Sequence, residues 1–260
     1  MAVSYDSYLR LDELLALQRP VSDGPEHDET LFIVIHQVNE LWFKQILHEL
    51  KLLQLAMENG HAPIVARTLK RVLAILETLV SQIDIQETMT PISFASYRQL
   101  LEAVNGLQSF QVLELEFVLG HRRPEIVEAF EDGSARRIRL ERLSGRPSVY
   151  DSFLRYLHLL DYPIPAEVLN RDLAQRHTES AAVQESLIEI CRHDPGAWQI
   201  CELLVDLDQG LMEWRYRHMR MVERTVGSVE GAGGSAGGGY LRSTLSEPLF
   251  PDLWAIRNEL

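Results

Sequence analysis

The chain has 260 residues, 46% of them hydrophobic, and a formal charge of −13 at neutral pH. That length can bury a large core, whereas the negative charge argues against binding to nucleic acids or anionic membranes. The two cysteines, Cys191 and Cys201, are too few for a disulfide framework and too widely spaced for a metal knuckle. The acidic N-terminus lacks the features of a signal peptide, and no apolar run reaches the roughly 18 residues of a membrane span, so we expect a cytoplasmic protein.

Apolar residues recur every three or four positions along most of the chain, and no alternating run predicts a strand. Proline and glycine mark the breaks, with Thr90-Pro91 before one helix and Gly120 and Gly227 after two others. The sequence therefore predicts an all-α fold, a helical bundle with long helices in one domain over residues 1–260. In chain order, we expect helices at residues 7–18, 31–50, 63–88, 93–104, 107–119, 125–130, 149–160, 165–175, 181–192 and 197–226.

The helix around residues 31–50 places one histidine, His36, in the middle of an apolar face. On a 3.6-residue period, Phe32, Phe43 and Leu47 lie on the same side of the helix. A buried imidazole there is either a satisfied core group or the polar point of a pocket, and pockets are few in any one protein. Taken alone, His36 leaves both interpretations open.

The last long helix carries a second histidine in a similar setting, since His218 lies on its apolar seam, one turn from Trp214 and Val222. Nearby arginines on other faces suit an anionic cofactor, although solvated helix charges are commoner; they are Arg215, Arg217 and Arg220. The chain lacks the two helical Glu-x-x-His motifs of a di-iron bundle and the His-Glu-x-x-His of a zinc protease. Two isolated helical histidines that could face each other across a bundle leave haem as the economical cofactor, with one axial ligand and one distal polar group.

A glycine-rich segment follows this helix, and residues 227–239 hold seven of the 15 glycines. Such a segment is either a flexible linker or a mobile loop that closes over a ligand. It also fits the dinucleotide-binding pattern of glycines, but it follows a helix and no βαβ unit surrounds it. We therefore reject a nucleotide site and keep the linker and the mobile loop as alternatives.

Several ordered motifs make the chain resemble the tryptophan 2,3-dioxygenase family over nearly its whole length. They lie at residues 5–11 (YDSYLRL), 27–29 (HDE), 32–37 (FIVIHQ), 40–42 (ELW), 87–91 (ETMTP), 97–98 (YR), 214–219 (WRYRHM) and 240–242 (YLR). The resemblance implies a helical homotetramer with a haem pocket, in which an N-terminal arm, residues 1–22, reaches a neighbouring subunit. It also implies an enzyme with haem b that uses O2 and adds both oxygen atoms across the indole C2–C3 bond of L-tryptophan, yielding N-formylkynurenine.

The resemblance carries residue roles onto matching positions of this chain. His218 is expected as the proximal haem ligand, and His36 as the distal histidine beside the substrate indole N–H. Phe32 is expected to pack on the indole, Arg98 to pair with the substrate carboxylate through its guanidinium fork, and Leu101 to line the same pocket. The arm residues expected to close the pocket of a neighbouring subunit are Tyr5, Tyr8 and Leu9.

The chain also departs from the family pattern in segments that the resemblance places at the pocket. Ala232 stands where the resemblance places a threonine that contacts the amino-acid end of the substrate. Without the threonine hydroxyl one hydrogen bond to the substrate is lost, which costs roughly 0.5–1.5 kcal/mol of binding free energy. Asn105 replaces a small serine near the haem, and Val112-Leu113 replaces an aromatic–arginine pair. Phe94 stands where some members carry tyrosine.

Three functions are therefore weighed. The family default is dioxygenation of L-tryptophan. The departures at Asn105 and Ala232 instead favour mono-oxygenation at C2, giving a 2-oxindole amino acid from tryptophan or from a substituted tryptophan such as the β-methyl form. A haem-binding sensor bundle without turnover is the third possibility, against which the glycine-rich segment and Arg98 argue.

Overall fold

The computed structural model describes residues 4–24, 26–102, 109–226, 245 and 247–260, without the side chains of residues 98–102 and 226. This part of the chain is helical and contains no strand, which confirms the all-α prediction. None of its helices is both long enough and apolar enough to cross a bilayer. The elements are α1 (Tyr5–Leu9), α2 (Leu11–Leu15), α3 (His27–Glu58), α4 (Ala62–Gln86), α5 (Pro91–Glu102), α6 (Phe110–Leu119), α7 (Pro124–Glu128), α8 (Ala135–Ser144), α9 (Val149–Leu159), α10 (Ala166–Leu169), α11 (Ala181–His193), α12 (Pro195–Val226), α14 (Pro251–Ala255) and the short 3-10 helix η1 (Ile256–Asn258).

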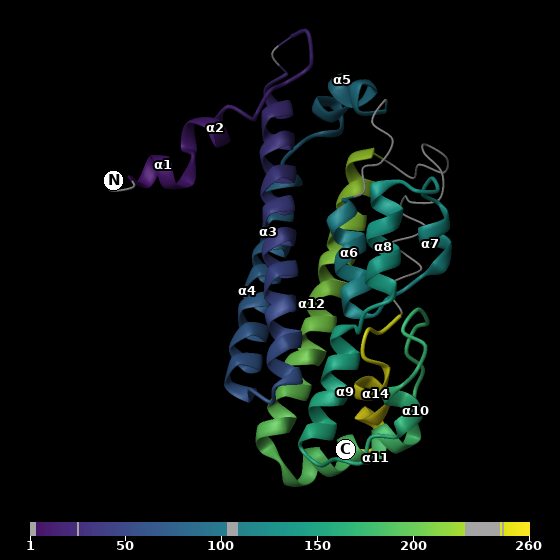
Figure 1. Ribbon diagram of the computed structural model, residues 1–260. Coiled ribbons are helices and arrows are strands. Elements are labelled where there is room, and N and C mark those ends of the chain that lie inside the picture. The colour runs from purple at the N-terminus through teal and green to yellow at the C-terminus, as the bar shows by residue number, and fades with distance from the viewer. Residues whose placement is uncertain (1–3, 25, 103–108, 227–244, 246) are drawn as a thin grey trace.

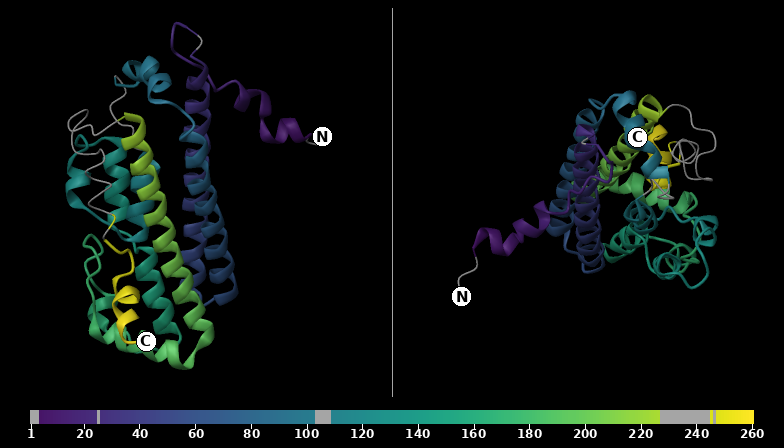
Figure 2. Two further views of the ribbon diagram at one scale, coloured as in Figure 1. Left: turned by 180° about the vertical axis from the view of Figure 1, so that it is seen from behind. Right: turned by 90° about the horizontal axis from the view of Figure 1, so that it is seen from above.

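The long helices α3, α4 and α12 lie side by side with α6 and α9, and together they form a bundle (Figures 1 and 2). A tight turn joins α3 to α4, and Gly60 adopts a positive φ of 69° there, a conformation that glycine takes without steric cost. Along α4 the buried residues recur every three or four positions, from Val65 through Val72 to Ile83. This seam packs against α3 and α12, so the helical period seen in the sequence corresponds to the core of the bundle.

The arrangement brings three helix ends together at one end of the bundle. There α3 begins while α4 and α12 end, and α5 lies next to them (Figure 1). At the opposite end, the carboxylate of Asp208 on α12 fastens the C-terminal segment. It accepts hydrogen bonds from the backbone N–H of Leu249 at 2.8 Å and from the Trp254 indole at 2.8 Å.

The N-terminal helices α1 and α2 extend away from the bundle (Figures 1 and 2). The prediction of one helix over residues 7–18 is wrong, because Arg10 has a positive φ of 53° and separates α1 from α2. Apolar side chains of this segment face solvent in the single chain, among them Leu15 and Leu17. Such a segment buries little of its own apolar surface within one subunit.

One more predicted boundary is wrong, and three short helices were not predicted. The helix predicted over residues 165–175 is limited to α10, after which Arg171 turns inward and binds the Asp151 carboxylate through two hydrogen bonds of 2.8 and 2.9 Å. Helix α8 was not predicted because it is rich in arginine and buries only Leu140, so its sequence shows no apolar stripe. The short α14 and η1 at the C-terminus were also missed.

Candidate active site

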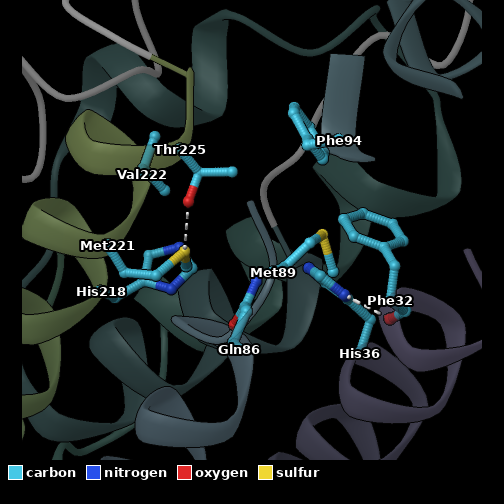
Figure 3. Close-up of a pocket in the computed structure, with 9 residues that line it drawn as sticks. All are labelled: Phe32, His36, Gln86, Met89, Phe94, His218, Met221, Val222 and Thr225. Carbon is cyan, nitrogen blue, oxygen red and sulfur yellow. Dashed lines mark hydrogen bonds between the residues drawn. The ribbon is translucent and has the colours of Figure 1, made fainter. Parts of the chain in front are cut away.

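A cavity that is partly open to solvent lies at the end of the bundle where α3, α4 and α12 meet (Figure 3). The walls are mainly apolar and aromatic, and the polar groups are few, as is usual for small-molecule sites. The lining residues are Phe32, His36, Gln86, Met89, Phe94, His218, Met221, Val222 and Thr225.

His36 enters the cavity from α3 with a defined ring orientation. Its Nδ1–H donates to the carbonyl oxygen of Phe32, one turn earlier, at 2.7 Å, so the neutral ring keeps Nε2 as an acceptor. The Phe32 ring lies 4.0 Å away between centroids. Burial lowers the pKa of His36, although the Phe32 carbonyl and the charge of Glu40 oppose this effect. The imidazole is therefore neutral at neutral pH.

His218 enters from α12 on the other side of the cavity (Figure 3). Its ring stacks on Trp214 at a centroid distance of 5.4 Å and an interplanar angle of 17°, and Trp214 in turn meets the edge of Phe43 at 5.3 Å. Burial, and to a lesser degree the His36 imidazole, lower the pKa of His218 to about 4. Neither ring nitrogen of His218 has a hydrogen-bond partner in the part of the chain that the structure describes.

An aromatic wall closes the cavity on the side of α5. Phe94 and Tyr97 pack edge to face at 5.5 Å, and each lies within 6.0 Å of the Phe32 ring. The Tyr97 hydroxyl donates to the sulfur of Met89 at 2.7 Å, which ties α5 to the end of α4. Burial raises the pKa of the Tyr97 phenol, so Tyr97 stays protonated. The wall therefore offers an apolar face to a planar ligand.

These residues fit a haem. A metal ligand must be an unprotonated imidazole, and the lowered pKa values of both histidines meet that condition. Among the described residues no group of three or more His, Cys, Asp or Glu side chains could hold a bare metal ion. The porphyrin of a haem already supplies four ligands to the iron. The protein therefore needs to supply only one axial imidazole and an apolar cavity for the porphyrin. The partnerless His218 is the residue suited to that position.

The structure brings together four residues that the sequence singled out, namely Phe32, His36, Phe94 and His218. The predicted contacts of Arg98 and Leu101 stay predictions: their backbone belongs to α5, but their side chains lie outside the description. The predictions for Asn105, Ala232 and the glycine-rich segment 227–239 also lie outside the described residues.

Three predicted residues lie far from the cavity of their own chain. Tyr5, Tyr8 and Leu9 belong to α1, which projects away from the bundle, and they are 73%, 77% and 41% exposed. Their predicted role was to close the pocket of a neighbouring subunit. That role requires a second chain and stays a prediction.

Two interpretations from the sequence are corrected. Arg215 is neither a solvated helix charge nor a group facing a cofactor, because it is fully buried and binds Glu116 at 2.8 Å. Val112 and Leu113, which replace residues that the resemblance places at the pocket, do not line the cavity. Both are buried in the hydrophobic packing around α6.

Sequence reasoning missed several lining residues, and two signals pointed to them. Met221 and Thr225 follow His218 at intervals of three and seven residues, so they share its helix face with Val222, which the apolar seam already included. Gln86 is a polar residue at a position of the apolar seam of α4. A polar side chain in such a seam marks either a buried hydrogen bond or a pocket.

Comparisons with known proteins agree with this geometry. Residues 1–139 and 195–260 match the family model described as tryptophan 2,3-dioxygenase. A protein of Herpetosiphon aurantiacus named tryptophan 2,3-dioxygenase is 52% identical over 259 residues, which cover 100% of this chain and 99% of the relative. Proteins with the same name from Anaeromyxobacter sp. strain K and Bacillus thuringiensis are 50% and 37% identical, over 97% and 93% of their own lengths and 100% and 99% of this chain.

Proposed function

The chain belongs to the tryptophan 2,3-dioxygenase family, and we propose that it is a haem-dependent enzyme that opens the indole ring of L-tryptophan. Both atoms of O2 are added across the indole C2–C3 bond, which gives N-formylkynurenine. The observation that carries the proposal is the pair of partly buried, neutral imidazoles that face one apolar cavity from α3 and α12. We place the reaction in the cytoplasm.

The chain's own residues have separate tasks in this site. When bound, haem would supply the iron that activates O2, and His218 is the residue that would hold that iron. His36 keeps an unprotonated Nε2 towards the cavity because its Nδ1–H is engaged by the Phe32 carbonyl. That nitrogen is suited to accept the indole N–H of the substrate and so to orient the ring. The apolar side chains around it exclude water from the reacting face.

We assign recognition of the substrate to an aromatic ring, Phe32, and to a guanidinium group, that of Arg98. Phe32 lies at the same wall as His36 and can pack against the indole, with Phe94 behind it. Arg98 on α5 is proposed to pair with the substrate carboxylate, and Leu101 to line the pocket beside it. Ala232 is proposed to lie at the amino-acid end of the substrate and Asn105 in the pocket near the haem, with segment 227–239 as a loop that closes over the ligand.

Assembly completes the site in this proposal. The arm over residues 1–22 is proposed to reach a neighbouring subunit of a homotetramer, where Tyr5, Tyr8 and Leu9 cover the pocket. The exposed position of these side chains in the single chain supports that role, since apolar groups on a projecting segment gain by burial against another surface. The chain thus supplies the arm to one pocket and the two histidines to another.

Mass spectrometry of the product tests the proposal. The ferrous holoenzyme is incubated with ¹⁸O-labelled O2 and either L-tryptophan or β-methyltryptophan. A ring-opened product from L-tryptophan with two labelled atoms is the expected result. One labelled atom in a 2-oxindole product, chiefly from the substituted substrate, would instead establish a monooxygenase. Haem binding without turnover or a tryptophan-induced spectral change would establish a sensor.

A further inference from the structure

We infer that Trp214 is a positioning residue for the axial histidine: its indole ring stacks on the His218 imidazole and fixes the plane in which that ring is presented to the haem iron. This inference deepens the function proposed above and rests on it. The two ring planes differ by only 17°, and their centroids lie 5.4 Å apart. Trp214 is 5% exposed and is not among the residues that line the cavity, so its effect on the haem is exerted through His218.

The plane of a histidine ring is set by contacts outside the side chain. The last torsion of histidine, about the Cβ–Cγ bond, has a broad energy profile and does not select one ring plane. A metal-binding histidine is usually held by a hydrogen bond from its second ring nitrogen. His36 has such a bond, to the Phe32 carbonyl at 2.7 Å, whereas His218 has none in the part of the chain that the structure describes. For His218, the stack on Trp214 is therefore the contact that defines the plane.

The indole opposes rotation of the imidazole because the two rings are nearly parallel. Aromatic rings at such centroid distances prefer an offset stack or an edge-to-face contact, and the small interplanar angle identifies this pair as an offset stack. Turning the His218 ring about its Cβ–Cγ bond would drive one edge into the indole face and lift the other edge away from it. Residues four apart lie one above the other on a helix, so the stack is formed within α12 itself.

The indole is itself held in place by a ring from another helix. Phe43 of α3 meets Trp214 edge to face, with the centroids 5.3 Å apart and an interplanar angle of 79°. Phe43 is 3% exposed, and both rings belong to the main hydrophobic core of the bundle. The next residue, Arg215, is fully buried and binds Glu116 of α6 at 2.8 Å, which joins the same turn of α12 to a further helix. Trp214 is therefore a fixed surface for the imidazole.

A fixed plane matters for an axial ligand in two ways. The overlap of the imidazole orbitals with those of an iron depends on the rotation of the ring about the iron–nitrogen bond, so a single plane gives a single bond strength. A ring that already has one orientation also loses less conformational freedom when it binds the iron. We therefore expect the stack to affect both the iron–histidine vibration and the retention of haem.

The test compares the wild-type holoenzyme with Trp214→Phe and Trp214→Met. Resonance Raman spectra of the ferrous enzymes, recorded without substrate and without O2, report the iron–histidine stretching band. Phenylalanine keeps a flat ring at this position, so the wild type and Trp214→Phe should both show one narrow band at similar frequency. Methionine fills gaps in a core but has no ring, so Trp214→Met should broaden or shift the band.

The rate of haem loss is a second measurement on the same proteins. Transfer of haem to apomyoglobin should be roughly twofold to tenfold faster from Trp214→Met than from the wild type, the range that the loss of one aromatic contact implies. If Trp214→Met does not fold, Phe43→Leu takes its place, because it leaves the indole present but removes the ring that supports it. That variant should also broaden the band.

A matched control is Trp198→Met, the same substitution on the same helix. Trp198 is partly buried against the hydrophobic core, but it lies near the start of α12, at the opposite end of the helix from His218. This variant should keep the wild-type band and the wild-type rate of haem loss. Haem content and far-UV circular dichroism confirm that each variant is folded and loaded.

A band of wild-type position and width in Trp214→Met would overturn the inference, because the stack would then not define the ring plane. Equal changes in Trp214→Phe and Trp214→Met would also overturn it, since a flat ring at this position would then have no special effect. A wild type without an iron–histidine band would overturn the inference together with the assignment of His218. Failure of the wild type to open the indole ring, with the band present, would concern the proposed function alone.

Discussion

The guanidinium of Arg215 and the carboxylate of Glu116 form an ion pair of 2.8 Å in which both side chains are fully buried. Arg123 binds the second oxygen of the same carboxylate at 2.8 Å. Arg215 lies one turn before His218 on α12, and Glu116 lies on α6. The pair therefore joins α12 to α6 one turn before His218.

Replacing Arg215 with methionine should destabilise the enzyme by about 3–5 kcal/mol, because Glu116 then stays buried with less compensation for its charge. Urea unfolding followed by circular dichroism measures the loss. Arg220→Met is the matched control on the same helix, since the Arg220 side chain is 60% exposed and an ion pair of an exposed arginine is worth under about 1 kcal/mol. Equal losses in the two variants would contradict a structural role for the buried pair.

Asp151 should make stability depend on pH in the acid range. Burial opposes its ionisation, but the contact with His177 Nε2 at 3.1 Å and the two hydrogen bonds from Arg171 outweigh this and hold the pKa of the carboxyl far below its ordinary value. A carboxyl whose pKa is lower in the folded state stabilises the protein above its unfolded pKa of about 3.9, and this contribution is lost as the pH falls below that value.

Asp151→Asn should therefore lower the melting temperature at neutral pH, and its difference from the wild type should shrink below about pH 4. Thermal unfolding between about pH 7 and about pH 3 measures the trend. A difference that stays constant across this range would show that the charge of Asp151 does not carry the effect. Asp206, which is exposed on α12, provides a control substitution with no such trend.

His218→Ala should abolish normal axial ligation of the haem, because His218 is the partnerless imidazole at the cavity. Absorption spectra and iron content of the purified protein measure this. His48→Ala removes an exposed histidine from α3 and should retain the wild-type spectrum. A His218→Ala enzyme that purifies with a full complement of normally ligated haem would refute the assignment.

Arg98→Ala should weaken the binding of L-tryptophan strongly and that of indoles without a carboxylate much less. The reason is that a guanidinium fork pairs with a carboxylate through two charge-assisted hydrogen bonds. Equilibrium titration of the haem spectrum with both ligands gives the two affinities. Arg98→Lys keeps the charge but not the fork, so it should recover only part of the loss. Equal losses of affinity for both ligands would contradict the proposed role of Arg98 in binding the substrate carboxylate.

Much of the site followed from local sequence patterns. The apolar period around His36 predicted that it shares a face with Phe32, and the structure places both rings at the cavity wall. The same argument applied to Trp214 and His218, which stack on each other. These predictions succeeded because residues three or four apart on a helix are neighbours whatever the rest of the fold does.

Local patterns failed where a distant segment decided the outcome. Arg215 looked like one of several solvated arginines, and only the approach of Glu116 from α6 makes it a buried group. The helix predicted to continue past residue 169 ends because Arg171 finds Asp151 on α9. The sequence contains no pattern that pairs Arg215 with Glu116 or Arg171 with Asp151, because the two residues of each pair lie far apart in the chain.

The amino-acid sequence alone determined that this protein is an all-α bundle with a histidine on the inner face of two long helices. Helical periodicity is a short-range property, and so it can be read without the fold. Only the tertiary structure decided that the two histidines face one cavity, that Gln86 lies between them, and that α1 projects away from its own bundle. Those relations depend on which helix faces pack together, and packing is settled by contacts between residues far apart in the chain.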